Sequence, residues 1–227
     1  MDYALTANGA RIIETRTGKV LEEHLLSKEA AKKAIAIGRK YDTLLEVYFD
    51  GQGYAQKDEI AQVKKYHKNP NMWDYFLRTR IAVDSLEDLL DEKEGNLDKV
   101  QMLFADMEER EEAWKELERE GVFELVGSLQ YNIEINAVGV NKGTGLVNLG
   151  KMLGIRREEI MACGDGDNDI AMLKEVGFGV AMANAEEKVK AVSKKISFVI
   201  FAEPYCPDCR AFVPFMEKFA ELNPFIH

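Results

Sequence analysis

Three aspartates stand at alternate positions, Asp165, Asp167 and Asp169, within the segment ACGDGDNDIAML of residues 162–173. Carboxylates this close together repel one another unless a cation or a special geometry compensates. A hard cation such as Mg²⁺ accepts a few carboxylates and keeps water or phosphate oxygens as its remaining ligands. The spacing therefore indicates a magnesium site that is also compatible with a phosphate group.

Two other interpretations of the acidic segment can be compared with this one. A calcium loop of the EF-hand type needs glycine at its sixth position and glutamate at its twelfth, and these positions hold Ile170 and Val176. A solvated turn in which Asp169 caps the next helix is favoured by the helix dipole. Capping explains one aspartate and leaves the other two crowded behind an apolar strand.

The run CGDGDNDIAML, followed by GFGVAMANAEEKVKAVSKKIS, resembles a known sequence signature. It is the signature nearest the C-terminus in the haloacid dehalogenase superfamily, and specifically in its Cof-type phosphatases. The resemblance implies that Asp165 is a direct ligand of Mg²⁺. It also implies that Asn168 and Asp169 complete the first or second shell around the metal. Asp167 falls on the variable position of the signature, so we expect no fixed role for it.

Two further segments carry the resemblance to residues that would hold phosphate. GVNKGTGL is similar to the family's Lys-Gly segment, which implies that Lys142 binds the substrate phosphate. A cation at a helix start opposes the dipole by about 0.3–1 kcal/mol, so Lys142 there makes more sense if an anion also binds; a merely solvated lysine is the alternative. Gly143 and Gly145 would let a phosphate approach the backbone. TANGARI resembles the family's Asn-Gly-Ala strand end, and Asn8 is assigned to phosphate binding with it.

The nucleophile motif of the superfamily is not found in the sequence. That motif is Asp-x-Asp-x-Thr or Val, whose first aspartate attacks phosphorus and whose second acts as acid and base. The Asp-x-Asp arrangements here belong to the acidic segment and lack the following Thr or Val. We therefore assign no catalytic residue, and expect a truncated form that is inactive alone and at best binds anions.

The alternation of strand and helix patterns predicts an α/β fold, with an incomplete Rossmann-like parallel sheet as core and an inserted α/β cap. The cap resembles that of the type IIB group. Helix starts are predicted after Ser27 and Ser85, at Asp106 with Glu109, and at Asn184 with Glu187. The predicted domains are listed by residue: core 1–12 and 138–196, cap 13–137, and a tail 197–227.

The tail differs in composition, because four of the five prolines lie at or after residue 204. It resembles the strand, Cys-x-x-Cys and helix of thioredoxin-like proteins, with Cys206 and Cys209 as the redox pair; a cysteine that opens a helix has a lowered thiol pKa. A stray surface pair or a zinc half-site is the alternative. We also expect the strand ISFVIFA to add to the core sheet.

Bulk properties limit the classes of partner. The net charge of -10 argues against nucleic acid or an anionic membrane, since both reward clustered Lys and Arg. No signal peptide or long apolar run is evident, and three cysteines do not make a secreted disulfide framework, so a cytoplasmic location is expected. The leading prediction is a Mg²⁺-dependent phosphatase of small phosphorylated metabolites. The alternatives are a thiol-disulfide oxidoreductase and a vestigial phosphate-binding protein without activity.

Overall fold

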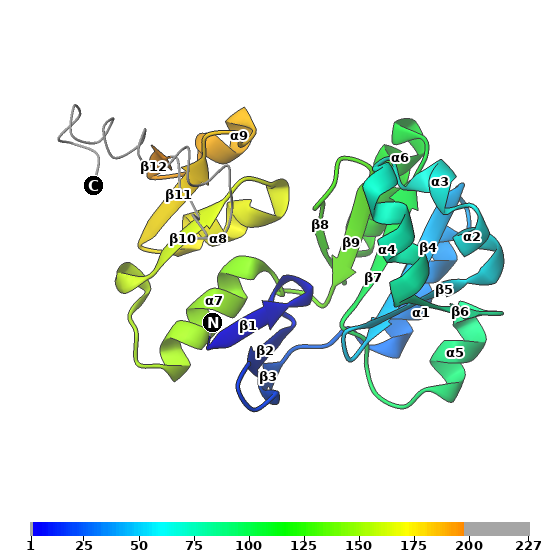
Figure 1. Cartoon of the computed structure of the whole chain (residues 1–227), viewed down its shortest axis with the longest axis horizontal. Coiled ribbons are helices and arrows are strands. Elements are labelled where there is room, and N and C mark those ends of the chain that lie inside the picture. The colour runs from blue at the N-terminus through cyan, green and yellow to red at the C-terminus, as the bar shows by residue number, and fades with distance from the viewer. Residues whose placement is uncertain (1, 198–227) are drawn as a thin grey trace. The chain divides into compact units, whose positions relative to one another are not determined.

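The computed structural model describes residues 2–197 of the chain (Figure 1). Short strands and helices alternate along it, as the sequence patterns predict. In chain order the elements are β1 (Tyr3–Thr6), η1 (Ala7–Gly9), β2 (Arg11–Glu14), β3 (Lys19–Glu23), α1 (Lys28–Gly38), β4 (Thr43–Phe49), β5 (Gln52–Gln56), α2 (Lys57–Ala61), α3 (Val63–Tyr66), η2 (Pro70–Met72), α4 (Trp73–Thr79), β6 (Arg80–Val83), α5 (Leu86–Glu92), β7 (Lys99–Phe104), α6 (Met107–Glu120), β8 (Glu124–Val126), β9 (Asn132–Asn136), α7 (Lys142–Met152), η3 (Arg157–Glu159), β10 (Met161–Gly164), η4 (Asp167–Asp169), α8 (Ile170–Glu175), β11 (Phe178–Met182), α9 (Glu187–Lys190) and β12 (Lys195–Ser197).

The first sheet is an antiparallel meander in the order β1-β2-β3. Gly18, with a φ of +71°, closes the hairpin between β2 and β3. Between β1 and β2 the short turn η1 places Asn8 in the left-handed region, with a φ of +62°. This conformation is less costly for asparagine than for most residues. The Asn8 side chain is directed toward β9, where its amide bonds to Glu134 and Asn136.

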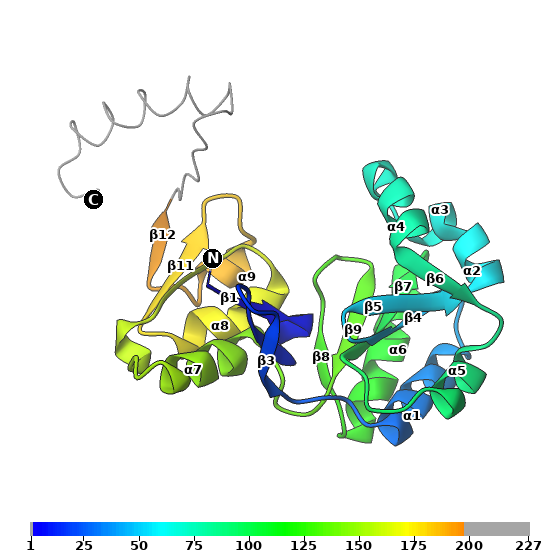
Figure 2. The same ribbon diagram turned by 60° about the horizontal axis from the view of Figure 1, so that its bottom comes forward.

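The second and largest sheet has six strands in the order β6-β5-β4-β7-β9-β8. A hairpin at Asp50 and Gly51, both with positive φ, joins β4 to β5. The helices α1, α5 and α6 lie on one face of this sheet, and α3 and α4 on the other (Figure 2). Their apolar side chains belong to two separate buried clusters. The sheet is therefore covered by helices on both faces over much of its width.

A row of polar side chains crosses the middle of this sheet. Glu46 of β4 lies opposite Gln101 of β7, and Gln101 lies opposite Glu134 of β9. Gln101 donates to Glu46 at 2.9 Å, and Lys99 bridges Gln101 at 3.2 Å and Glu134 at 3.0 Å. Arg80 completes the row as the ion-pair partner of the fully buried Glu46. Each buried carboxylate is thus paired, as burial requires.

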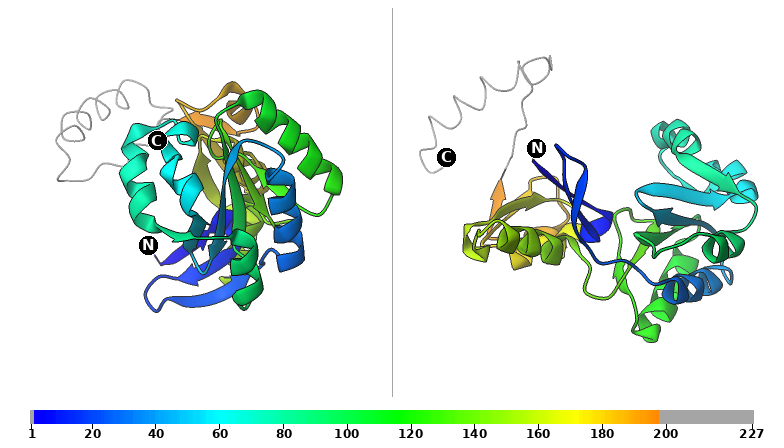
Figure 3. Two further views of the ribbon diagram at one scale, coloured as in Figure 1. Left: turned by 90° about the vertical axis from the view of Figure 1, so that its right-hand side faces the viewer. Right: turned by 90° about the horizontal axis from the view of Figure 1, so that it is seen from below.

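The third sheet has the order β10-β11-β12, and β10 and β11 run parallel. The helix α8 connects them, and α7 and α8 lie on one face of the pair (Figure 3). This is the parallel β/α arrangement that the sequence predicts after residue 138. The carboxyl end of β10, at Gly164, leads directly into the acidic segment. Ligands of such sheets bind at these strand ends.

One predicted element differs from the structure. The helix expected to begin at Asn184 with Glu187 is only the four-residue α9, and Glu186 precedes it without a side-chain cap. The amide of Asn184 donates to Asp165 instead of capping, which explains the later helix start.

Several expectations stay predictions. β12 lies beside β11, but the rest of the strand expected over residues 196–202, together with Cys206 and Cys209, lies outside the described residues. The division into core, cap and tail likewise remains a prediction. Across residues 2–197, none of the helices is long and apolar enough to cross a membrane.

Candidate active site

The acidic segment forms a tight turn at the end of β10. The carboxylate of Asp165 is exposed, and one of its oxygens accepts a hydrogen bond from the amide of Asn184 at 3.3 Å. Asp167 is also exposed and forms an ion pair with Lys188 at 2.5 Å. Asn168 is half-buried. The three aspartates therefore diverge, and only Asp165 presents a carboxylate without an ion pair among the described residues.

Asp169 is the buried member of the segment, at 6% exposure. Its Oδ2 accepts hydrogen bonds from the backbone amides of Asp165 at 2.9 Å and Gly166 at 3.1 Å. It precedes α8 but makes no side-chain cap to it, so the capping interpretation of this residue is wrong. The carboxylate instead ties down the turn that carries Asp165.

Gly164 provides the space that this arrangement needs. A Cβ added there would lie 2.6 Å from Cγ of Asp169 and 2.7 Å from its Oδ2, closer than real side-chain atoms approach. The first glycine of the segment thus allows Asp169 to pack directly over the end of β10. This is a packing reason for glycine that the sequence pattern alone does not reveal.

The second oxygen of Asp169 contacts Lys142, the residue predicted to bind phosphate. Its Oδ1 accepts a hydrogen bond from Nζ of Lys142 at 2.6 Å, and the lysine side chain is 34% exposed. Burial raises the pKa of Asp169, but the Lys142 ammonium and the amides of Gly166 and Asp165 outweigh it, so that the pKa lies below its ordinary value. Asp169 is therefore a carboxylate at neutral pH, and it holds Lys142 beside Asp165.

Lys142 is the first residue of α7, where the helix dipole opposes its charge. The carboxamide of Asn141 accepts hydrogen bonds from the amides of Gly143 and Thr144, both at 3.0 Å, and the Thr144 hydroxyl accepts one from the Asn141 amide. Two of the free amides at this helix start are therefore already bonded. The ion pair with Asp169 offsets the unfavourable dipole.

The glycines of α7 are explained by close packing. A Cβ on Gly143 would lie 2.8 Å from the carbonyl oxygen of Ala171 in α8, and one on Gly145 would lie 2.9 Å from Cα of Gly9. These contacts bring the start of α7 against both α8 and η1. The phosphate approach expected for these glycines stays a prediction, because the structure gives them another reason to be small.

Asn8 is directed elsewhere. Its amide donates to Oε2 of Glu134 at 2.6 Å and to Oδ1 of Asn136 at 2.9 Å, so it joins η1 to β9. Asn8 still lines a cavity of about 300 Å³ together with Lys142 and Asp169; the other lining residues are Leu5, Leu146, Cys163 and Met172. The three predicted residues thus gather around one cavity, while the amide of Asn8 is already used.

The donor set fits a magnesium ion in part. Carboxylate and amide oxygens are the ligands that Mg²⁺ takes from proteins, and one or two carboxylates with water and phosphate suffice. Asp165 offers such a carboxylate, whereas both oxygens of Asp169 are engaged. No group of three acidic, histidine or cysteine side chains with metal-binding geometry occurs within the described range. A metal would therefore be held by Asp165 and completed by phosphate and water.

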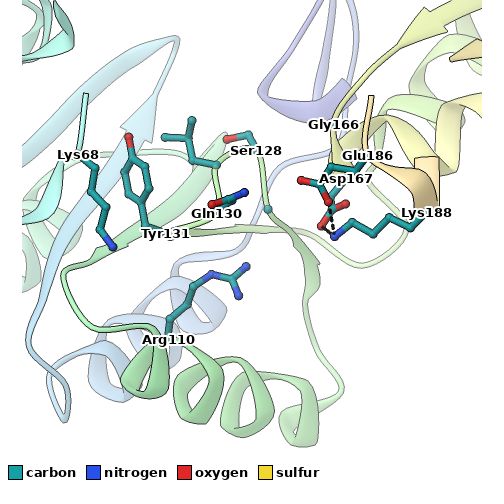
Figure 4. Close-up of a pocket in the computed structure, with 11 residues that line it drawn as sticks. Lys68, Arg110, Ser128, Gln130, Tyr131, Gly166, Asp167, Glu186 and Lys188 are labelled. Carbon is teal, nitrogen blue, oxygen red and sulfur yellow. Dashed lines mark hydrogen bonds and ion pairs between the residues drawn. The ribbon is translucent and has the colours of Figure 1, made fainter. Parts of the chain in front are cut away.

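A second, larger pocket was not foreseen from the sequence. It has a volume of about 630 Å³ and begins at Gly166 and Asp167, directly after Asp165 (Figure 4). Lys68 and Arg110, from the six-stranded sheet and its helices, line it as well. Neither residue belongs to a motif, and more than forty positions separate them in the chain, so no sequence signal could have paired them.

Comparison with known proteins relates this chain to a family of hydrolases. A family model described as haloacid dehalogenase-like hydrolase matches residues 1–198. Over 88 residues, 39% of this chain, the sequence is 44% identical to the 5-amino-6-(5-phospho-D-ribitylamino)uracil phosphatase YcsE of Bacillus subtilis. The matched segment spans only 35% of the length of that enzyme.

Two solved structures share the fold. A haloacid dehalogenase-like hydrolase from B. subtilis superposes with a TM-score of 0.76 at 24% identity, covering 86% of this chain and 74% of the other. A sugar phosphatase of haloacid dehalogenase subclass IIB gives 0.69 at 22% identity, covering 97% and 76%. At these identities the likeness concerns the fold. It confirms the predicted α/β class. The match to the family model over residues 1–198 confirms the predicted resemblance to the haloacid dehalogenase superfamily.

Proposed function

The chain belongs to the haloacid dehalogenase-like hydrolase family, and we propose that it provides the metal- and phosphate-binding part of a Mg²⁺-dependent phosphatase of small phosphorylated metabolites. The observation that carries the proposal is the arrangement around Asp169. One of its oxygens holds Lys142 at 2.6 Å and the other holds the turn of Asp165. A cation for phosphate and a carboxylate for a metal are thereby fixed by a single buried side chain.

Each residue has a distinct role in this proposal. The ammonium of Lys142, partly exposed, neutralises a phosphate oxygen at the start of α7. The Asp165 carboxylate holds the metal, and Asn184, which already donates to it, orients it. When bound, Mg²⁺ would polarise the phosphoryl oxygens and neutralise their charge. Asp169 acts through both neighbours and touches no substrate.

Binding of magnesium tests the metal site. We expect Asp165→Asn to weaken Mg²⁺ binding at least tenfold in the presence of inorganic phosphate, as measured by isothermal titration calorimetry. Asp167→Asn removes the same charge from the same turn, and we expect it to lose less than threefold because Asp167 is paired with Lys188. Equal losses in the two variants would show that the turn attracts the cation by net charge alone.

Hydrolysis is a separate question, because no residue of the chain is assigned as the nucleophile. With p-nitrophenyl phosphate and Mg²⁺ we expect phosphate release close to the uncatalysed rate. If release is instead robust and disappears in Asp165→Ala, an attacking group is present in this chain and the assignment of no nucleophile is wrong.

A further inference from the structure

The larger pocket has two walls of different charge. One wall consists of Gly166, Asp167, Glu186 and Lys188, and the other of Lys68, Arg110 and the turn over residues 127–131. On the first wall Lys188 is already paired, with Asp167 at 2.5 Å and with Glu186 at 3.1 Å. That wall therefore has no unpaired cation for a ligand.

The opposite wall carries two cations that are poorly neutralised. Lys68 is exposed and lies 5.8 Å from the ring centroid of Tyr131; in the part of the chain that the structure describes, it has no ion-pair partner. Within residues 2–197, the ion-pair partner of Arg110 is Glu111 alone, at 3.2 Å, and the Glu111 side chain is 60% exposed and therefore well screened by solvent. The wall has a net positive charge.

Arg110 is held so that its guanidinium faces the hollow. Its Nε donates to the backbone carbonyl of Asn132 at 2.9 Å, and the guanidinium carbon lies 5.1 Å from the centroid of the Trp114 ring. Figure 4 shows Lys68 and Arg110 on the same side of the pocket as Tyr131, across from Asp167 and Lys188. Burial lowers the pKa of Arg110, and Glu111 and Asp167 offset it only in part. A ligand anion would supply the missing countercharge.

We propose that the substrate carries a second anionic group, a carboxylate or a second phosphate, which Arg110 and Lys68 bind at the end remote from the reacting phosphate. The inference rests on the proposed function, since it takes the reacting phosphate to lie at Lys142 and Asp165. The pocket begins one residue after Asp165, so a ligand anchored there extends into it. Arg110 offers the planar fork that matches a carboxylate or phosphate, and Lys68 adds a point charge.

Stable phosphonates test the proposal without any need for turnover. We would measure binding of ω-carboxyalkylphosphonates and of alkylphosphonates with the same number of carbons to the full chain, with Mg²⁺, by titration calorimetry. The carboxylate should improve affinity at least tenfold at one chain length or more. Bisphosphonates of the same lengths distinguish a preference for phosphate from one for carboxylate. The proposal would be overturned if, at every chain length, neither the carboxyalkylphosphonates nor the bisphosphonates bound more tightly than the alkylphosphonates.

Variants assign the effect to the two residues. Lys68→Gln and Arg110→Gln should each remove most of the preference for the second anion and leave alkylphosphonate affinity within twofold. Lys64→Gln is the matched control, because Lys64 contacts the Trp73 ring and does not line the pocket. If Arg110→Gln disturbs folding, Lys68→Gln still tests the preference for the second anion, because Lys68 is exposed. Full retention of the preference in Lys68→Gln and Arg110→Gln would contradict the assignment.

The same titrations separate this inference from the proposed function. If inorganic phosphate binds with Mg²⁺ and depends on Lys142, but no second anion is preferred, the inference alone fails. If neither inorganic phosphate nor any phosphonate binds, the proposed function fails and the inference fails with it.

Discussion

At the scale of single residues, Asp169 connects the two parts of the proposed site. Its two oxygens reach Lys142 on α7 and the amides of Asp165 and Gly166 on the turn. A buried carboxylate is costly unless it is paired and hydrogen-bonded, and here both conditions are met. The same bonds that stabilise Asp169 fix the separation between the cation and the carboxylate proposed for phosphate and metal.

Replacing Asp169 with asparagine tests this role. Asp169→Asn leaves Lys142 without its ion pair, and we expect a loss of about 1–3 kcal/mol in the free energy of unfolding at neutral pH. Urea denaturation measures it. Asp167→Asn, which breaks a more exposed pair with Lys188, should lose less than about 1 kcal/mol. Comparable losses in both variants would mean that the burial of Asp169 has no energetic consequence.

The difference should depend on pH in one direction. Because the pKa of Asp169 is lowered in the folded protein, its contribution is complete above its unfolded pKa of about 4 and is lost as the pH falls through the folded value. The stability gap between wild type and Asp169→Asn should therefore be flat from pH 8 to about 5 and close below about 4. A gap that closes between pH 8 and 6 would implicate another group.

The sequence allowed the acidic segment and Lys142 to be predicted as neighbours in function, because their residue types follow a family signature. The inward turn of Asp169 could not be predicted, since it depends on the space above Gly164. The partners of Asn8 could not be predicted either: Glu134 and Asn136 lie more than 120 residues further along the chain. Local patterns carry no information about contacts at that separation.

At the scale of elements, the position of α7 decides where Lys142 lies. Gly145 packs directly against the backbone of Gly9. A Cβ on Gly145 would lie 2.9 Å from Cα of Gly9 and 3.0 Å from Cδ2 of Leu5. Gly150, one and a half turns later, would place a Cβ mainly against the flexible end of the Ile160 side chain. The two glycines thus differ in what surrounds them while sharing the same helix.

This contrast gives a matched pair of substitutions. Gly→Ala in a helix gains about 1 kcal/mol from propensity, but overpacking costs about 1–3 kcal/mol. We expect Gly145→Ala to lower the midpoint of thermal unfolding and to weaken inorganic phosphate binding through Lys142. Gly150→Ala should change the midpoint much less and leave phosphate binding intact. If Gly145→Ala is as stable as wild type, the close packing of α7 on η1 is not needed.

Helix ends were the most predictable elements. Ser27, Ser85 and Asp106 each accept a hydrogen bond from a backbone amide in the first turn of the helix they precede, as their positions in the sequence indicate. Gly121, in the left-handed region, ends α6. At Asn184 the same local rule failed, because its amide bonds to Asp165. Capping is local, and tertiary contacts can override it.

At the scale of the whole described structure, Arg11 connects the first sheet to the six-stranded sheet. Its guanidinium contacts Asp98 at 2.5 Å, Asp50 at 2.7 Å and Glu23 at 3.1 Å. Asp98 is 2% exposed. One arginine on β2 thus neutralises a buried carboxylate next to β7, and the planar fork allows several carboxylates to share it.

Removal of this cation should be severe. Arg11→Met leaves Asp98 buried without its ion pair, and we expect a loss of about 3–5 kcal/mol in the free energy of unfolding, measured by urea denaturation. Arg11→Lys should recover less than half, because an ammonium cannot copy the fork. Arg16→Met, which breaks an exposed pair with Asp2, is the control and should cost less than about 1 kcal/mol. A small loss in Arg11→Met would show that Asp98 is satisfied by the Gly51 amide alone.

The polar row of the six-stranded sheet has a consequence for how the chain assembles. Glu46, Gln101 and Glu134 face one another across three strands that are far apart in sequence. A slip of one residue in β7 would turn Gln101 and Lys99 toward the apolar layer beneath α1 and α6, and would bring Val100 and Met102 among charges. A folding intermediate with β7 shifted by one residue would therefore bury unpaired polar groups and be destabilised. The polar row thus favours the native register of β4, β7 and β9.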